Sequence, residues 1–161
     1  MVIIELQVKP YLAEYARAKY NSVDGGVLFP AESLLVHAIV NATITRPRTV
    51  VPVSGNLQVA IREKGISKDM HRNNYLKASS MKHISDLLYI DFKSTLCEYM
   101  DSEYYKHGID YQVSAAKFYE KYRLQSITVE ALLKIHIRWK HQRKLFRKEA
   151  EQREISFNKL N

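Results

Sequence analysis

Apolar and polar residues alternate at the start of the chain, and the pattern then changes to helical spacing. Residues Val2 to Lys9 are rich in β-branched side chains, which is typical of a strand. Pro10 suits the first turn of a following helix, because a proline there loses no intrahelical hydrogen bond. The apolar positions after it keep the spacing of one helical stripe: Tyr11, Leu12, Tyr15, Ala16 and Tyr20. We therefore predict a strand followed by a helix.

The next segment predicts short elements separated by turns. Asn21 to Gly26 has the composition of a turn-rich connector, and Val27 to Phe29 is expected to form a short strand. A second helix is expected from about Ala31 to Thr43, and it ends before the Arg46-Pro47 pair. Its apolar residues form one stripe, and it contains no Lys or Arg.

Two further apolar runs indicate a β-hairpin. Thr49 to Val53 and Leu57 to Ile61 flank Ser54-Gly55-Asn56, which has the composition of a short hairpin loop. Gly65 to Asn74 is polar and is expected to be a loop. This loop is the most plausible boundary between a first half of mixed α and β structure and a helical second half.

The second half reads as helices throughout. From Tyr75 to about Tyr105 the chain lacks Gly and Pro, which fits one long helix or two consecutive ones. Gly108 ends that stretch, and Val113 to Tyr122 has the pattern of a short helix. A final helix begins near Ser126 or Thr128.

These elements predict an α+β fold that is mainly helical. A small N-terminal antiparallel sheet or hairpin with helices, residues 1–74, precedes a helical basic half, residues 75–161, and the two are subdomains or one continuous domain. A length of 161 residues with 46% hydrophobic and 26% charged residues is that of an ordinary globular chain. No internal repeat is evident.

The positive charge is concentrated in the last third of the chain. Residues 1–111 carry 13 Lys or Arg and 12 Asp or Glu, whereas residues 112–161 carry 12 and 5, so their net charges are +1 and +7. No acid occurs from Ala131 to Lys148, although a solvated helix normally mixes both signs. Such asymmetry indicates a polyanionic partner.

The basic segment has the proportions of a helix-turn-helix. A short helix from Ser114 is followed by a turn at Arg123 to Ile127 and by a second helix that Thr128 caps. On a helical wheel Leu132, Ile135 and Trp139 form a core face, and the opposite face carries Lys134, Arg138 and His141 with Glu130. The turn lacks the Gly that is common in this motif, and the second helix is longer than base contacts need.

In this interpretation the second helix enters the major groove of duplex DNA. Arg138 or Lys134 would meet guanine edges, and Ser126 and Thr128 with the first amides of the helix would hold a phosphate. Further phosphate contacts are expected from Lys117, Lys121, Arg123, Arg143, Lys144 and Arg147. The alternative is a helical pair with a solvated surface that contacts no DNA. A winged helix in the first half is disfavoured, because its helix offers only Glu32, Ser33, His37 and Asn41 as polar contacts.

No catalytic, metal or cofactor signature is found, so we expect neither an enzyme nor a bound cofactor or metal. The six His include no i, i+4 pair and are expected at the surface, and Cys97 is expected to be a buried structural thiol. The acids of the long helix are spread around it, which disfavours a metal nuclease. The single Cys and the absence of a signal or a long apolar run predict a cytoplasmic, non-membrane protein.

Taken together, these features predict a DNA-binding protein of the regulatory or replication-accessory type, such as one carried by a mobile element. The eleven Tyr residues are also compatible with a homodimer, since Tyr is enriched where proteins self-associate. Two other functions fit the same charge pattern. One is an assembly subunit whose basic helix docks on an acidic protein, and the other is a binder of RNA or single strands through Tyr and Arg.

Overall fold

The computed structural model describes residues 1–48 and 54–158, with side chains up to residue 151. Contacts divide the chain into two compact units. Unit 1 comprises residues 1–92 and 119–126, and unit 2 comprises residues 93–118 and those from 127 onward. The predicted α+β fold is confirmed, with helices concentrated in the C-terminal half. No helix among the described residues combines the length and the apolar character needed to cross a bilayer.

Unit 1 contains a four-stranded sheet formed by β1 (Val2–Leu6), β2 (Asn21–Val23), β3 (Gly26–Leu28) and β4 (Leu57–Ile61). The strand order is β1-β4-β3-β2. The pairs β1–β4 and β2–β3 are antiparallel, whereas β3 and β4 are parallel. The sheet is therefore mixed and not purely antiparallel as expected, because the chain crosses over through a helix between β3 and β4.

The two short strands β2 and β3 form a tight hairpin. β3 matches the short strand predicted at Val27 to Phe29, whereas β2 and the turn lie in the segment that the sequence indicated only as a connector. Asp24 and Gly25 are its two turn residues, and both have positive φ angles, 51° and 83°. This is the conformation that a two-residue hairpin loop requires, and Asp-Gly is among the strongest sequence signals for it. The hairpin that the sequence predicted, Thr49 to Val53 with Leu57 to Ile61, is tested only in part. β4 forms, but Thr49 to Val53 lies outside the described residues.

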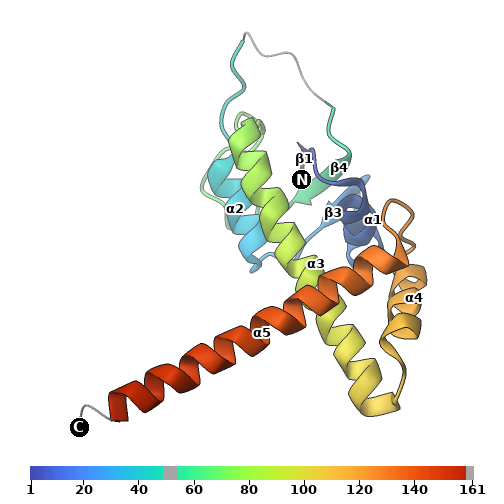
Figure 1. Cartoon of the computed structure of the whole chain (residues 1–161). Coiled ribbons are helices and arrows are strands. Elements are labelled where there is room, and N and C mark those ends of the chain that lie inside the picture. The colour runs from blue at the N-terminus through green and yellow to red at the C-terminus, as the bar shows by residue number, and fades with distance from the viewer. Residues whose placement is uncertain (49–53, 159–161) are drawn as a thin grey trace. The chain divides into compact units, whose positions relative to one another are not determined.

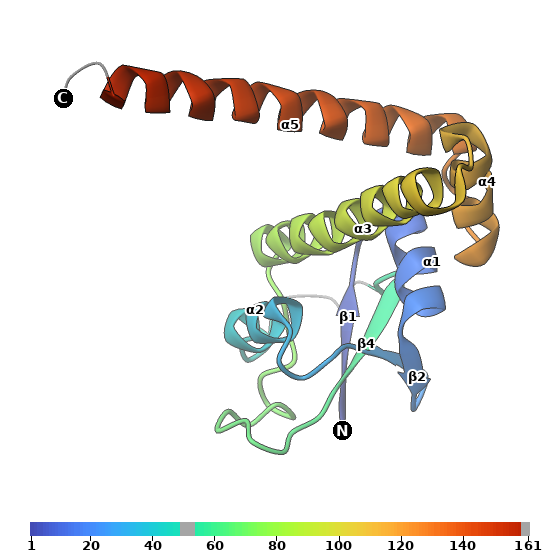
Figure 2. The same ribbon diagram turned by 90° about the horizontal axis from the view of Figure 1, so that it is seen from below.

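Two helices of unit 1 follow strands in sequence. Helix α1 (Pro10–Lys19) begins at the predicted proline and buries Leu12, Tyr15 and Ala16. Helix α2 (Leu34–Ala42) starts three residues later than predicted, because the Ser33 side chain accepts a hydrogen bond from the Val36 amide and caps it. In both views α2 and α1 lie on opposite flanks of β1 and β4 (Figure 1, Figure 2).

Helix α3 (Ala78–His107) is one continuous helix of 30 residues. Its buried residues recur every four positions, so they lie on one stripe along the helix: Ile84, Leu88, Phe92, Leu96 and Met100. The first three belong to the core of unit 1, and the last two belong to unit 2.

Unit 2 is helical. It contains the second part of α3, most of α4 (Tyr111–Lys121) and α5 (Val129–Asn158). Phe118 of α4 is fully buried and its ring centroid lies 5.6 Å from that of Tyr99 on α3. Cys97 is buried, as predicted, and burial raises the pKa of its thiol to about 12. A thiol with so high a pKa stays protonated at neutral pH and is a poor nucleophile.

Candidate nucleic-acid interface

The predicted turn between the two helices is closed by a Schellman motif. Helix α4 ends at Lys121, the Leu124 amide donates to the Tyr119 carbonyl, and the Arg123 amide donates to the Glu120 carbonyl. Arg123 has a φ of 49°, in the left-handed region that usually selects glycine. The chain therefore makes a glycine-type helix end with an arginine, which explains why the expected turn glycine is missing.

Thr128 caps α5 as predicted, since its hydroxyl accepts a hydrogen bond from the Ala131 amide at 3.2 Å. Ser126 has an internal partner instead. Its hydroxyl donates to the Glu14 carboxylate, and the Ser126 and Gln125 amides donate to the same carboxylate at 3.1 and 2.8 Å. These contacts lower the pKa of Glu14 although partial burial acts against them. A phosphate at Ser126 would have to displace this carboxylate.

The buried face of α5 is centred on Leu132 and His136, whose exposed fractions are 0% and 1%. Leu132 is buried as predicted, whereas Ile135 and Trp139 remain partly exposed. The expectation that all six His lie at the surface is wrong for His136. Its Nε2 lies 2.9 Å from an oxygen of Asp101 on α3, and its ring lies against the rings of Tyr111 and Trp139.

His136 is held in its neutral form. Burial lowers the pKa of its imidazole below the ordinary value of 6.5, and this outweighs the opposing effect of the Asp101 carboxylate. The Lys140 ammonium also lowers the pKa. A neutral imidazole that donates its Nε2 proton satisfies Asp101 without placing a charge in the core.

This arrangement predicts a dependence of stability on pH. Because the folded pKa of His136 lies below the unfolded pKa, the unfolded chain takes up the proton more readily, and stability falls as the pH drops below about 6.5. Urea unfolding followed at pH 8, 6.5 and 5.5 should show a decreasing midpoint. The variant His136→Gln should lose this part of the decrease and His141→Gln should keep it; an equal decrease in both variants would contradict the assignment.

Two of the predicted contact residues and Lys140 are bound within unit 2. Lys117 forms an ion pair with Glu103 at 3.1 Å, and Arg143 lies 3.9 Å from Asp101 with its guanidinium 4.7 Å from the Trp139 ring centroid. Lys140 donates to the Tyr111 hydroxyl at 2.9 Å. These cations help to hold the helices together, so only part of the positive charge of unit 2 is available to an external partner. Lys121 and Arg123 are exposed residues of unit 1.

The opposite face of α5 carries the exposed cations. We define the cationic face as Lys134, Arg138, His141, Lys144 and Lys148, all of which are exposed. Most of these positions are three or four residues apart, so they follow one side of the helix, away from Leu132 and His136. Lys134 forms an ion pair with Glu130 at 2.7 Å. Among the described side chains no ion pair involves Arg138, Lys144 or Lys148.

The side chains that the structure describes in the outer half of α5 are all exposed. Every residue from His141 to Glu151 is exposed, including Leu145 and Phe146, and Arg147 extends the set of cations. Figure 1 shows the outer turns of α5 running away from α4. This part of the helix is therefore available to a partner on all sides.

The described residues contain no cluster of three or more His, Cys, Asp or Glu side chains that could hold a metal ion. No protein-family model, curated protein or solved structure matches this chain. Its function must therefore be inferred from the chemistry of its own residues.

Proposed function

We propose that this protein binds duplex DNA through the cationic face of α5. The proposal depends above all on one observation: no acidic residue occurs from Ala131 to Lys148, and the side chains from His141 onward to Glu151 are exposed. A row of like charges repels itself, and binding a polyanion relieves that repulsion and releases counterions from the nucleic acid. We propose binding and not catalysis, in the cytoplasm, without a metal or cofactor.

The dimensions of the cationic face are compatible with a duplex. Lys134 and Lys148 lie about 21 Å apart along the helix axis at the usual helical rise. The major groove of B-DNA admits a single α-helix, and phosphates line it on both sides. A helix with cations along one face can therefore lie in or across the groove over several base pairs.

The proposed roles follow from what each side chain already contacts. Arg138 lies near the middle of the acid-free stretch and is the best candidate for a guanine edge, while Lys144, Arg147 and Lys148 are candidates for phosphates. Lys134 must exchange Glu130 for its DNA partner. Lys117 and Arg143 would contact phosphate only in competition with Glu103 and Asp101.

A second candidate function is docking on an acidic protein surface. Three large apolar side chains of α5 are exposed, namely Ile137, Leu145 and Phe146, with exposed fractions of 61%, 47% and 69%. Duplex DNA offers these side chains few apolar partners, whereas a protein surface with acidic and apolar groups would satisfy both kinds of residue. Binding to RNA or single strands and formation of a homodimer remain proposals of the same kind.

The deciding experiment measures binding of labelled duplex across a salt series. The double variant Arg138→Gln, Lys148→Gln should weaken binding by about 10- to 100-fold and reduce the salt slope by about 1, since Lys148 is the phosphate contact of the two and each lost phosphate contact reduces the slope by roughly 1. Single-stranded DNA and RNA of the same sequence show whether the duplex is preferred.

The matched control is Lys77→Gln, Lys82→Gln. It removes the same net charge from two exposed positions at the start of α3 and should leave binding nearly unchanged. Equal losses in the two double variants would indicate a nonspecific charge effect. Absence of duplex binding by the intact protein at low salt would refute the proposal and favour the acidic protein partner.

A further inference from the structure

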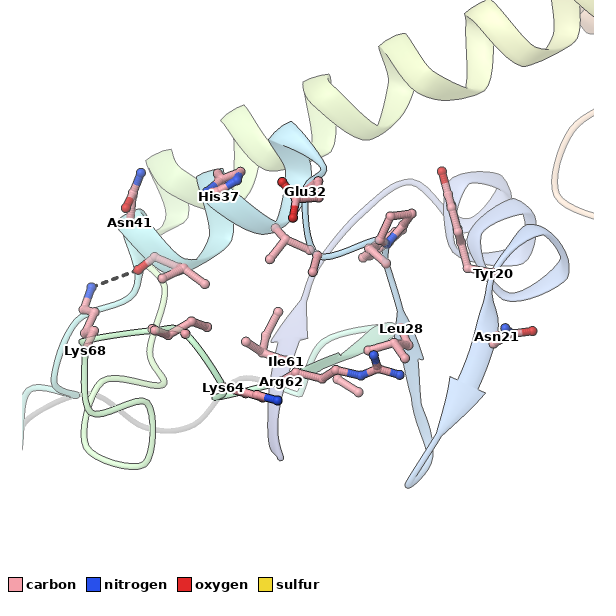
Figure 3. Close-up of a pocket in the computed structure, with 18 of the residues that line it drawn as sticks. Tyr20, Asn21, Leu28, Glu32, His37, Asn41, Ile61, Arg62, Lys64 and Lys68 are labelled. Carbon is pink, nitrogen blue, oxygen red and sulfur yellow. Dashed lines mark hydrogen bonds between the residues drawn. The ribbon is translucent and has the colours of Figure 1, made fainter.

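Unit 1 contains a groove that plays no part in the proposed DNA contact. The groove has a volume of about 1000 Å³ and lies between α2 and the ends of β3 and β4. The segment 62–68, which follows β4, forms a further wall of the groove (Figure 3). The volume is at the upper end of the range found for small-molecule sites in proteins.

The topology of the sheet explains why a groove forms here. β3 and β4 are the parallel pair, and α2 connects them, so the groove lies at their carboxyl ends beneath the crossover helix. Ligands of α/β sheets bind characteristically at the carboxyl ends of parallel strands, because the chain leaves each strand there in a different direction.

Part of the inner surface of the groove is apolar. Leu28 and Ile61 contribute from the strands, and Val36 and Val40 contribute from α2. Leu28, Val36 and Val40 are only partly buried although all are aliphatic. An apolar ligand body would remove these side chains from water, which is favourable in proportion to the area covered.

Cations lie along the strand side of this apolar surface. Arg62 and Lys64 are exposed, and among the described side chains no ion pair involves either of them. The acid between them, Glu63, is bound elsewhere, at 3.1 Å to the N-terminal ammonium and at 3.0 Å to His71. Glu32 is the one acid among the described lining residues.

Lys68 brings a third positive charge that is fixed in position. Its ammonium donates to the Val40 carbonyl at 3.0 Å and to the Thr43 carbonyl, at the end of α2. Figure 3 shows this side chain extending to α2, with Arg62 and Lys64 on the strand side of the groove. An ammonium has three N–H donors, so one remains for a ligand after these two bonds.

We propose that this groove binds a small organic anion, a carboxylate or phosphate on an apolar body, with the anionic group at Arg62 and Lys64, the body against α2, and Lys68 at the other end of the groove. This site is independent of the cationic face of α5, and its failure would leave the proposed DNA binding untouched.

The probe for this test is 8-anilinonaphthalene-1-sulfonate, a fluorescent aromatic anion, compared with the uncharged N-phenyl-1-naphthylamine. The intact protein should bind the anion, and Arg62→Gln, Lys64→Gln should weaken its binding by about tenfold or more while leaving the uncharged dye nearly unchanged. Val36→Trp, which fills the groove, should weaken both dyes. Circular dichroism of each variant confirms that it is folded.

Competition identifies the anionic group. Octanoate tests an aliphatic carboxylate, and adenosine monophosphate tests a phosphate on an aromatic body; displacement of the bound sulfonate by either supports the proposal. The controls Lys77→Gln, Lys82→Gln and Arg138→Gln, Lys148→Gln should bind the probe as the intact protein does. The proposal is overturned if Arg62→Gln, Lys64→Gln binds the anionic probe normally, or if neither competitor displaces it.

Discussion

Replacing His136 by alanine is expected to lower the stability of unit 2 by about 3 kcal/mol. His136 is almost fully buried, so the substitution leaves a cavity between α5 and α3. It also removes the donor 2.9 Å from Asp101 and leaves that partly buried carboxylate with Arg143, at 3.9 Å, as its ion-pair partner among the described residues. Both effects act on the contact that fixes the first turns of α5 to α3.

The measurement is hydrogen exchange of the α5 amides from Leu132 to Lys140, together with thermal unfolding. Exchange of these amides should accelerate by up to about 150-fold, the ratio that corresponds to about 3 kcal/mol at 25 °C. His141→Ala is the matched control, because it removes the same side chain from an exposed position of the same helix and should change stability by less than about 0.5 kcal/mol. Similar protection in both variants would show that His136 does not hold the helix.

Substituting Gly55 by alanine is expected to destabilise unit 1 by about 2 to 3 kcal/mol. A Cβ atom at this position would lie 2.5 Å from the carbonyl oxygen of Leu6 and 2.8 Å from the Leu6 amide nitrogen. These are backbone atoms of β1, which pairs with β4 and cannot give way without breaking sheet hydrogen bonds. The glycine is needed for this close approach.

Urea unfolding of Gly55→Ala and of Ser54→Ala provides the comparison. Ser54 is exposed and adjacent, so its substitution should change the free energy of unfolding by less than about 0.5 kcal/mol. A Gly55→Ala protein as stable as the Ser54→Ala protein would mean that β1 adjusts to the added methyl group.

The contacts of Ser54 to Asn56 differ from those that the composition suggested. The sequence indicated a hairpin loop there, but Gly55 donates to Glu5 and the Asn56 side chain bonds both the amide and the carbonyl of Val8. The amide group of Asn56 therefore acts as a strand partner for the chain after β1. Turn-forming composition and close approach to a distant strand both favour Gly and Asn, so composition alone cannot separate them.

The candidate interface was predictable only as far as it depends on residues close in sequence. Charge counting located the basic helix, and periodicity placed Arg138 and His141 opposite Leu132, because both depend on residues close in sequence. Neither charge counting nor periodicity could show that Glu14 binds Ser126 or that Asp101 binds His136, since these partners are 112 and 35 residues apart in the sequence. From the sequence alone, the acidic residues of α3 could have paired with any nearby basic residue.

The sequence by itself determined the local features of this protein: the start of α1 at Pro10, the cap of α5 at Thr128, the helical character of the α3 segment and the surplus of positive charge in the last third. These follow from propensity, capping and charge, which act within a few residues. Only the tertiary structure decided which cations are bound by acids, which His is buried, and that β3 lies parallel to β4 with a groove at their ends. Such features depend on pairings between segments far apart in the chain, and many pairings satisfy the same local pattern until the core selects one.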